Sequence, residues 1–537
     1  TTREYSVALL SNGAMTDFVV TSQVGNYPAV GDGFNKFRGV APGCRWAGAK
    51  VFTNAGSGDT TTIGGGIDGL VANRVANNIK VMNLSLGVIG TPGISATQRQ
   101  KVNTAVNNGI VVVVSAGNDG TGSTAAARTI DDPGRAAMAL TVAASDDNNQ
   151  LTDYTSQGFT SPVSTSGQEE DYKPDVMAPG GSQSYYSSIL SVDSNSRDGT
   201  GFADMQTNDY YNIQGTSMAC PFVAGCAALL IDALQQRGVA WDFNSSQHSR
   251  YIKMVLCATT SESNANRDDG GVSRGDGITV NPTLERAATG PNGFPVGKDH
   301  YEGYGMINPD AAVEAVSLTY AYGATNTAAL GPSVTDRRAW ARTVNLIAGQ
   351  AFHPALTVPA GGDYDLYLYS ATPSAYGTPV LLASSTTAGN GGSESFSYTP
   401  STATNGLLVV KRVSGSGTFT LMSDAALSVT SHGTLYSWLD QYGLVSGYDY
   451  EAADDADVDG DGYAAWQEYE AGTVPTNSNS KFLSLIEMSN GAPQVGWTPN
   501  LGTTRVYTVS GRTNLTSGVW GITNSGTRFY RVKVQKP

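Results

Sequence analysis

Cysteine is scarce in this chain, and its distribution excludes one way of stabilising the fold. The four cysteines, Cys44, Cys220, Cys226 and Cys257, all fall in the first 260 of 537 residues, so they cannot form a disulfide framework that spans the chain. Cys220 and Cys226 share one apolar helical stretch but lie on different faces of it, which argues against a bridge between them. We expect four small buried hydrophobic side chains, and cysteine usage leaves the redox compartment open.

Basic residues are also few. The chain has 32 Lys and Arg against 46 Asp and Glu, which gives a net charge of −14 and a sequence pI of about 4.7. This balance argues against nucleic acid or an anionic membrane as a partner. It fits a soluble protein that uses calcium and is secreted or displayed at the cell surface.

Long apolar runs are missing as well. We find no stretch of about 18 apolar residues and therefore predict no transmembrane helix. No signal peptide is visible, and the chain begins Thr1-Thr2-Arg3 without an initiator Met, which we interpret as a cut N-terminus. The 64 glycines and 40% hydrophobic residues instead indicate a turn-rich globular protein of several domains.

Strand and helix patterns alternate in the first part of the chain. Ile110 to Val114 is a β-branched run typical of a strand buried on both faces of a parallel sheet, and Leu140 to Ala144 repeats it. This alternation predicts right-handed βαβ units and an α/β domain. Around these two runs we expect strands at 5–10, 18–20, 47–52 and 81–86. We expect helices at 66–77 and 98–108.

The stretch from Gln214 to Gly225 carries the clearest chemical signal. Small residues flank Ser217, as a site needs when a substrate backbone must approach a nucleophile. An apolar helix follows, and we expect Pro221 in its first turn, where the missing N–H costs nothing. The start of a helix also favours developing negative charge. Taken alone, Gly-Thr-Ser is equally consistent with an ordinary helix N-cap.

Several motifs, in order along the chain, resemble those of the subtilisin-like serine peptidases. The Ser217 string matches the nucleophile motif of that family, although Phe222 stands where the family usually has His. Asn118 lies in an Ala-Gly-Asn motif directly after the buried strand. The remaining matches are a GVAP turn, an N-x-S-L-G strand, a KPD loop and the approach to the last helix, at 39–43, 83–87, 173–180 and 304–312. The resemblance implies an α/β, subtilisin-like parallel-sheet domain that hydrolyses polypeptides.

The same resemblance implies roles for individual residues. Ser217 would be the nucleophile and Asn118 a donor to the oxyanion, although an Asn after Gly is also a common turn residue. The residues that would line the substrate channel and pair with an extended peptide are Ser85, Leu86, Gly87, Ser115, Ala116 and Gly117. Because Ala116 and Gly117 are small, we expect a roomy pocket and broad specificity.

The general base and the group that orients it do not match the family pattern. All four histidines, His248, His300, His353 and His432, follow Ser217, whereas the family's His precedes the GVAP turn. Either Thr16 stands in the place of that His, before a degenerate helix, or residues 1–38 are an insertion and the Asp and His lie upstream of residue 1. We favour the second alternative, because a sheet without its Asp-bearing strand would leave strand edges unpaired. The 537-residue chain is expected to be nearly inert.

Strands replace helices after the peptidase-like region. Alternating runs separated by Gly, Pro and Ser predict a β-sandwich over 319–428, similar to pre-peptidase C-terminal domains. The tyrosine-rich strand from Asp363 to Tyr369 is either core or a face that contacts carbohydrate. Carbohydrate or cell-surface contact is therefore one expectation for the β-domains.

An acidic loop in the next segment matches a calcium-binding pattern. Residues 457–468 read D-x-D-x-D-G-x₅-E, and the resulting ligands would be Asp457, Asp459, Asp461, the carbonyl of Tyr463 and a bidentate Glu468. The loop resembles an EF-hand-like, dockerin-type loop, and the alternative is an acidic solvated turn. We predict a structural Ca²⁺ in a short helical unit over 429–480, followed by a small β domain or sorting-type tail over 481–537.

Two functions remain open at this point. The first is a secreted, bacterial-type serine endopeptidase whose peptidase domain covers 1–318, with the chain a fragment that lacks its base and orienting acid. The second is a non-catalytic surface or binding protein built on a degenerate peptidase fold. Both are expected to be monomers.

Overall fold

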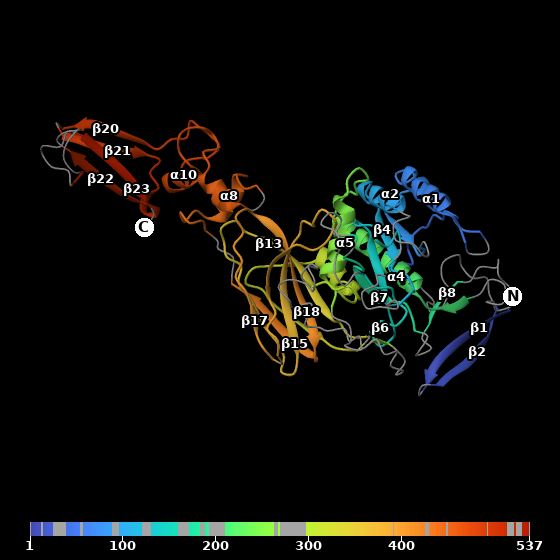
Figure 1. Cartoon of the computed structure of the whole chain (residues 1–537). Coiled ribbons are helices and arrows are strands. Elements are labelled where there is room, and N and C mark those ends of the chain that lie inside the picture. Colours follow the sequence, from blue (N-terminus) through green and yellow to red (C-terminus); the bar gives the residue numbers. More distant parts are fainter. Residues whose placement is uncertain are drawn as a thin grey trace. The chain divides into compact units, whose positions relative to one another are not determined.

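The computed structural model of the chain contains a mixed α/β region followed by β-sheets and short helices (Figure 1). It describes residues 2–11, 14–24, 39–53, 57–87, 96–120, 130, 132–158, 170, 172–182, 188–192, 210–261, 267–268, 297–333, 335–389, 391–424, 429–446, 449–490, 492–512, 520–521 and 529–535. Two compact units are present. The first comprises 1–344, 354–396 and 405–422, and the second comprises 345–353, 397–404 and 423–537.

A parallel sheet organises the first unit, which confirms the predicted α/β class. Strands β3 (Val81–Leu84), β4 (Val111–Ser115) and β5 (Leu140–Ser145) pair in parallel, and β7 (Val176–Pro179) pairs with β5 in the same sense. The sheet continues through β6 (Leu151–Thr152) to β10 (Arg267–Asp268). Parallel strands bring their carboxyl ends to one edge of a sheet, so the residues after β3 and β4 come together there.

Helices cover both faces of this sheet, and the side chains of β4 show why. Val111 and Val113 belong to the core that includes α4 (Thr216–Gln236), α5 (Gln247–Ala258) and α7 (Pro309–Ser317). Val112 and Val114 belong to the opposite core, together with α1 (Thr60–Ala72) and α2 (Ala96–Asn107). Alternate residues of a strand point to opposite faces, so a continuous run of valines is needed where both faces are buried.

Helix α4 differs from the sequence prediction in two respects. By length and composition it could cross a membrane, so the expectation that no such stretch exists was wrong, although its side chains pack against the sheet as those of a core helix do. Pro221 is not in the first turn, because the helix already begins at Thr216. The carbonyl of Ser217, four residues earlier, therefore lacks the N–H that it would receive in an uninterrupted helix.

The segment before β3 also departs from the prediction. Residues 47–52 were expected as a strand, but they form no ladder, and 47–50 are exposed. Among the described residues β3 is the edge strand of the sheet. No described strand therefore pairs with residues 47–52. Helix α1 covers 60–72 and not the expected 66–77, because Asp59 caps it by accepting a hydrogen bond from the Thr62 backbone N–H at 2.7 Å.

Two hairpins precede the nucleophile segment. Strands β1 (Thr2–Ser11) and β2 (Ala14–Val24) pair in antiparallel fashion, which confirms the strand signals near the start of the chain. Because Thr16 and the residues after it lie in β2, the alternative in which they begin a degenerate helix was wrong. Strands β8 (Ile189–Val192) and β9 (Tyr210–Ile213) form a second antiparallel hairpin, which the sequence did not predict.

The β-sandwich sequence forms two antiparallel-rich sheets. One contains β11 (Thr319–Tyr320), β13 (Ala339–Leu346), β18 (Thr404–Ser414), β15 (Asp363–Ser370) and β16 (Leu381–Ser385); the other contains β12 (Thr325–Leu330), β19 (Gly417–Ser423), β14 (Pro354–Thr357) and β17 (Glu394–Ser395). Phe419 joins the two sheets through edge-to-face contacts with Trp340 and Tyr364. The Tyr364 hydroxyl donates to the backbone carbonyls of Leu330 and Gly417 at 3.1 and 3.0 Å.

The tyrosine-rich strand β15 is core and not an exposed carbohydrate platform. Tyr364, Tyr367 and Tyr369 are only 1%, 1% and 6% exposed. Tyr367 and Tyr369 stack with ring centroids 5.7 Å apart and share a hydrophobic core with residues of α5 and α7. The sandwich therefore buries one face against the peptidase-like region, and an ion pair between Arg342 and Glu314 adds to this contact.

The second unit combines short helices with β-hairpins. Its helices are α8 (Tyr436–Gln441), α9 (Tyr450–Asp455) and α10 (Ala465–Ala471), with a 3₁₀ turn at Gly502–Thr504. Its strands form two separate pairs, β20 (Leu483–Ser489) with β21 (Ala492–Thr498) and β22 (Val506–Arg512) with β23 (Phe529–Gln535). The mixture of helices and strands agrees with the coarse prediction, whereas the four domain boundaries stay predictions.

The cysteines are all unpaired, as expected from their positions. Cys220, Cys226 and Cys257 are buried, and burial raises the pKa of each thiol to about 12. Cys44 is exposed, so the expectation of four buried side chains was wrong for this residue.

Candidate functional site

Ser217 lies in the first turn of α4, beside the carboxyl ends of β3 and β4. The residue before the helix, Gly215, has φ of 149°, a backbone conformation that residues with side chains rarely adopt. A Cβ at this position would lie 3.5 Å from Asn118 Oδ1. The Gly215 N–H donates to the Gly180 carbonyl at 2.9 Å, which ties the start of the helix to the end of β7.

Asn118 is held against this helix start by Thr216. The Thr216 backbone N–H and its hydroxyl both donate to Asn118 Oδ1, at 2.9 and 3.0 Å. The Thr216 hydroxyl oxygen in turn accepts the Gly117 N–H at 3.1 Å. Because Asn118 Oδ1 accepts both hydrogen bonds, the NH₂ group of the same amide points away from Thr216. This NH₂ group can donate to another acceptor. Asn118 thus lies against Thr216, the residue before Ser217, whereas the catalytic roles of Asn118 and Ser217 stay predictions.

Ser85 contacts the nucleophile segment through the backbone. Its hydroxyl donates to the Ser217 carbonyl at 2.8 Å, which is the carbonyl that Pro221 leaves without a helical partner. The Asn83 side-chain NH₂ donates to Ser85 Oγ at 3.1 Å. Ser85 was predicted to line the substrate channel, and the structure shows it in this supporting contact.

The other predicted channel residues lie around the same edge of the sheet. Leu86 and Gly87 continue from β3, and the Leu86 side chain packs on the core that contains α1 and α2. Ser115 and Ala116 are buried, whereas Gly117 is half-buried with φ of 107°. Their role in binding a peptide stays a prediction.

A cavity of about 390 Å³ opens beside this pair of residues. Its lining residues are Asn118, Asp119, Gly120, Asp153, Tyr154, Gln214 and Gly215. The sequence predicted a role only for Asn118 among them, although Gln214 and Gly215 begin the Ser217 stretch. The cavity could not be predicted because its residues come from three separate segments of the chain. Thr216 was likewise missed as the residue that orients Asn118, although it stands next to Ser217.

None of the four histidines contacts Ser217 within the described part of the chain. His248 accepts the Asp242 N–H at 3.2 Å and packs on Trp241. His300 is buried, and this burial lowers its pKa to about 4. His353 and His432 belong to the second compact unit. Within the described residues, Ser217 and Asn118 therefore have no histidine among their contacts.

The KPD loop forms a buried charge cluster next to β7. Asp175 accepts hydrogen bonds from Lys173 Nζ at 2.7 Å and from Lys298 Nζ at 2.8 Å, and Lys253 Nζ lies 3.4 Å away. Burial alone would raise the pKa of Asp175, but the three ammonium groups hold it well below its usual range. Burial lowers the pKa of Lys173 to about 7. This cluster anchors the loop that carries Gly303 against the sheet, since the Tyr304 N–H donates to the Asp175 carbonyl at 2.8 Å.

A serine at a helix start, with an amide donor fixed beside it, is the arrangement expected of an acyl-transfer site. The pattern of the subtilase family matches residues 19–305, which is more than half of the chain. The chain therefore belongs to the subtilase family.

The relatives found by comparison are proteases. Subtilisin Savinase from Lederbergia lenta is 34% identical over 203 residues, covering 38% of this chain and 58% of that protein. An alkaline protease from Alkalihalobacillus alcalophilus is 34% identical over 203 residues, covering 38% of this chain and 41% of that protein. Among solved structures, proteases from Pseudoalteromonas arctica PAMC 21717 share 26% identity and a TM-score of 0.33 over 49% of this chain and 60% of theirs. The chain thus spans 41–58% of the length of these two sequence relatives.

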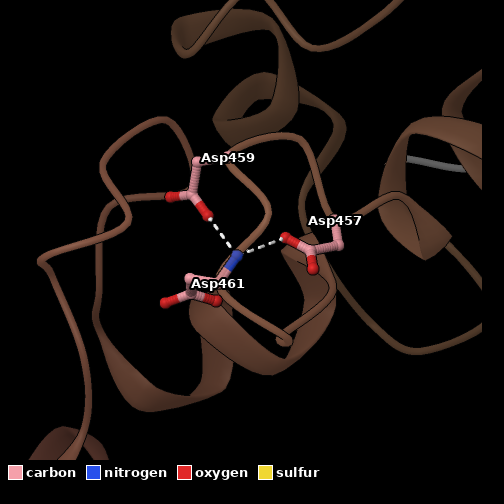
Figure 2. Close-up of side chains that lie close together, drawn as sticks. All are labelled: Asp457, Asp459 and Asp461. Carbon is pink, nitrogen blue, oxygen red and sulfur yellow. Dashed lines mark hydrogen bonds between the residues drawn. The ribbon is translucent and has the colours of Figure 1, made fainter.

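The predicted calcium loop brings three carboxylates together, as Figure 2 shows. The relevant oxygens of Asp457, Asp459 and Asp461 all lie within 4.8 Å of one another. Asp457 Oδ1 accepts the N–H groups of Gly460 and Asp461, at 2.9 and 3.1 Å, so the loop curls around this side chain. Positive φ at Gly460 and Gly462, 75° and 96°, permits the turn.

The donor set of the loop fits a hard cation. The Asp461 side chain is only 1% exposed, and the buried Oδ2 atoms of Asp459 and Asp461 accept no hydrogen bond from described residues. Glu468 on α10 is 2% exposed, and its carboxylate is not in the group of three close carboxylates. Carboxylate oxygens are the ligands that Ca²⁺ prefers.

Proposed function

We propose that this protein is a serine endopeptidase of the subtilisin type, which cleaves polypeptides through an acyl-enzyme on Ser217. The observation that carries the proposal is the engagement of Asn118 Oδ1 by Thr216, at 2.9 and 3.0 Å, beside the serine. It leaves the Asn118 NH₂ group and the helix start as donors for the oxyanion that forms when the serine attacks a carbonyl. The acidic composition supports action outside the cell.

The general base and its orienting acid are proposed to come from residues that are not among these 537. Proton removal from a serine hydroxyl needs a base within hydrogen-bond reach, and no described histidine provides it. Among the described strands, β3 is paired on one side only, and its other side, next to Ser85, is where a further parallel strand would pair and bring such residues to the site. A binding protein on a degenerate peptidase fold is the alternative function.

A fluorophosphonate probe distinguishes these functions, because it reacts only with an activated serine. We expect labelling at Ser217 in a product of the gene that includes the upstream reading frame, and none in its Ser217→Ala variant. The chain of residues 1–537 alone should stay unlabelled. An upstream region that begins with a start codon and encodes neither Asp nor His motifs, or a longer product that is not labelled, would contradict the peptidase.

We propose in addition that the loop of Asp457, Asp459 and Asp461 binds a structural Ca²⁺. The three close carboxylates support this proposal, since Lys481, 3.9 Å from Asp461 Oδ2, is the one cation paired with them among the described residues. The buried Oδ2 of Asp459 accepts no hydrogen bond, and a buried anion is costly without a partner. The backbone carbonyl of Tyr463 and the carboxylate of Glu468 would complete the ligand set. When bound, the ion would offset two of the four carboxylate charges and fix the loop to α10.

Titration of the full chain with CaCl₂ after chelation tests this second proposal. At a free concentration 100 times the Kd, one ion should stabilise its unit by about 2.7 kcal/mol. Asp461→Asn should abolish the shift in melting temperature, whereas Asp440→Asn, an exposed carboxylate of the same unit, should leave it unchanged. A melting temperature that is unaffected by millimolar Ca²⁺ would refute the site.

A further inference from the structure

The tail, residues 481–537, reverses the charge of the rest of the chain. It contains seven Lys and Arg against one acidic residue, Glu487, whereas residues 1–480 contain 25 Lys and Arg against 45 Asp and Glu. The seven basic residues are Lys481, Arg505, Arg512, Arg528, Arg531, Lys533 and Lys536. The net charge of −14, which argues against anionic partners for the chain as a whole, therefore does not describe the tail.

Two of these basic side chains stabilise the second unit itself. Lys481 Nζ lies 3.9 Å from Asp461 Oδ2 in the acidic loop. Arg505 donates from Nε and Nη2 to the backbone carbonyls of Glu470 and Tyr469 on α10, at 2.7 Å each. The other basic residues of the described part of the tail form no ion pair with any described residue; they are Arg512, Arg531 and Lys533.

The strand register places these three charges on one face of the β22–β23 hairpin. Ser510 pairs with Arg531, and side chains of directly paired residues lie on the same face. Alternate residues of a strand also share a face, so Arg512 joins this face from β22 and Lys533 joins it from β23. We call it the basic face. The Cα atoms of Arg531 and Lys533 are separated by two steps of an extended strand, about 7 Å.

Trp520 fixes two of the guanidinium groups. Gly511 and Gly521 form an antiparallel bridge, which brings Trp520 opposite Arg512. The guanidinium carbons of Arg512 and Arg531 lie 4.7 and 5.1 Å from the centroid of the Trp520 ring. Cation–π contacts of this kind hold both positive charges side by side. Their positions are therefore set before any partner binds.

The one acidic residue of the tail does not lie on the basic face. Ser484 pairs with Trp497, so alternation puts Glu487 on the opposite face of the β20–β21 hairpin from Trp497. Trp497 stacks on Tyr507 with ring centroids 4.8 Å apart, and Tyr507 lies on the face of β22 opposite to Arg512. The tail residues outside the described ranges include no Asp or Glu. No carboxylate of the tail therefore offsets the basic face.

The basic face is polar between its charges. Thr508 and Gln535 are exposed on it, and Ser510 is half-buried. Their hydroxyl and amide groups can exchange hydrogen bonds with hydroxyl groups of a partner. The exposed side chains of Leu483 and Leu485, by contrast, lie on the face of the other hairpin that is turned away from Trp497. Apolar groups that a membrane would take up are therefore not joined to the positive charges.

We propose that the basic face of the tail binds an acidic polysaccharide, a chain of sugars that carry carboxylate groups. Arg512, Arg531 and Lys533 would bind the carboxylates, and the polar residues between them would bind sugar hydroxyl groups. Nucleic acid fits less well, because both guanidinium groups already cover Trp520 and the acidic remainder of the chain repels a dense polyanion. This surface is separate from Ser217, so the inference does not depend on the proposed peptidase function.

Polygalacturonate and its methyl ester test the proposal, because the two polymers share a sugar backbone and differ in charge. The full chain is titrated over each immobilised polymer by biolayer interferometry, in buffer without added divalent cations. We expect the acid to bind at least about tenfold more tightly than the ester, and this preference to weaken as NaCl is raised from about 50 to 500 mM. Equal binding of the two polymers would overturn the proposal.

Matched variants locate the surface. Lys533→Gln and Arg531→Gln should each weaken binding to polygalacturonate at least about threefold, whereas Lys533→Arg should keep it. Arg45→Gln removes an equal exposed charge from the first unit and should change nothing. Because the Lys533 side chain is exposed, Lys533→Gln should also leave the melting temperature unchanged, so a loss of binding is not a loss of folding.

Rival partners are included as separate arms. Duplex DNA and vesicles of phosphatidylserine are titrated with the same proteins. Tighter binding of either than of polygalacturonate, lost in Lys533→Gln, would assign the basic face to that partner and overturn the proposal. Polygalacturonate binding that is the same in the parent, Lys533→Gln and Arg531→Gln would overturn it as well.

Discussion

The contact between Ser85 and the nucleophile helix can be measured, because a proline creates the need for it. Pro221 has no N–H, so the Ser217 carbonyl four residues earlier has no helical donor. The Ser85 hydroxyl fills that position from β3, at 2.8 Å. Ser85→Ala should therefore leave a carbonyl in the first turn of α4 without a protein donor.

The size of the effect follows from the burial of this carbonyl. A buried acceptor without a partner costs about 1–3 kcal/mol, and the half-buried position of Ser217 places the expected loss at the lower end, about 1–1.5 kcal/mol. In a Pro221→Ala background, the new N–H of residue 221 can donate to the same carbonyl. There Ser85→Ala should cost only a few tenths of that amount, so the two substitutions should be coupled by about 1 kcal/mol.

The assay is a double-mutant cycle. Near-UV circular dichroism monitors the urea unfolding of the first compact unit in each protein. The four proteins are the parent, the two single variants and the double variant. A coupling energy below about 0.5 kcal/mol is within the error of additivity for independent sites. That result would refute the argument that Ser85 replaces the hydrogen bond lost at Pro221.

Three further substitutions test the packing around the site. Asp175→Asn leaves three buried ammonium groups without their counter-charge and should cost about 3–5 kcal/mol in urea unfolding, so a loss below about 1 kcal/mol would show that the lysines do not need it. Gly225→Ala puts a Cβ 2.7 Å from the side chain of Val40 in the GVAP turn, and it should lower the free energy of unfolding by about 1–3 kcal/mol. Gly69→Ala has open space around it and should raise the same free energy by about 0.5–1 kcal/mol, so equal effects of the two substitutions would contradict the close approach. Tyr367→Ala should cost about 3–5 kcal/mol, and exposed Tyr376→Ala less than about 0.5; a small loss at both would show that the sandwich contributes little to the first unit.

Much of the fold was predictable because its signals are local. The valine run of β4 identifies a strand buried on both faces, and the apolar helix after Ser217 identifies α4. The strand expected at 47–52 failed for a physical reason. A strand exists only where a neighbour accepts its hydrogen bonds, and the sequence pattern of one segment cannot show whether that neighbour is present.

Some residues of the candidate site could be predicted from the sequence, and others could not. Asn118 and Ser217 stand in motifs, so the sequence identified them. Thr216, which fixes the amide of Asn118, and Asp153, which lines the cavity, carry no pattern of their own. Their roles depend on residues about 100 and 35 positions away along the chain, and only the folded backbone brings these together.

The contacts around Ser217 are made within the described part of the chain. Thr216 holds the amide of Asn118, and Gly215 ties the start of α4 to the segment after β7. These are the groups proposed as donors to an oxyanion. Ser85 and Pro221 together fix the carbonyl of the nucleophile itself. Electrostatic preorganisation of this kind belongs to the scaffold, whereas proton transfer requires a group that must be added to it. The orientation of Asn118 and the reactivity of Ser217 are therefore separate properties of the chain, and the labelling experiment tests only the second.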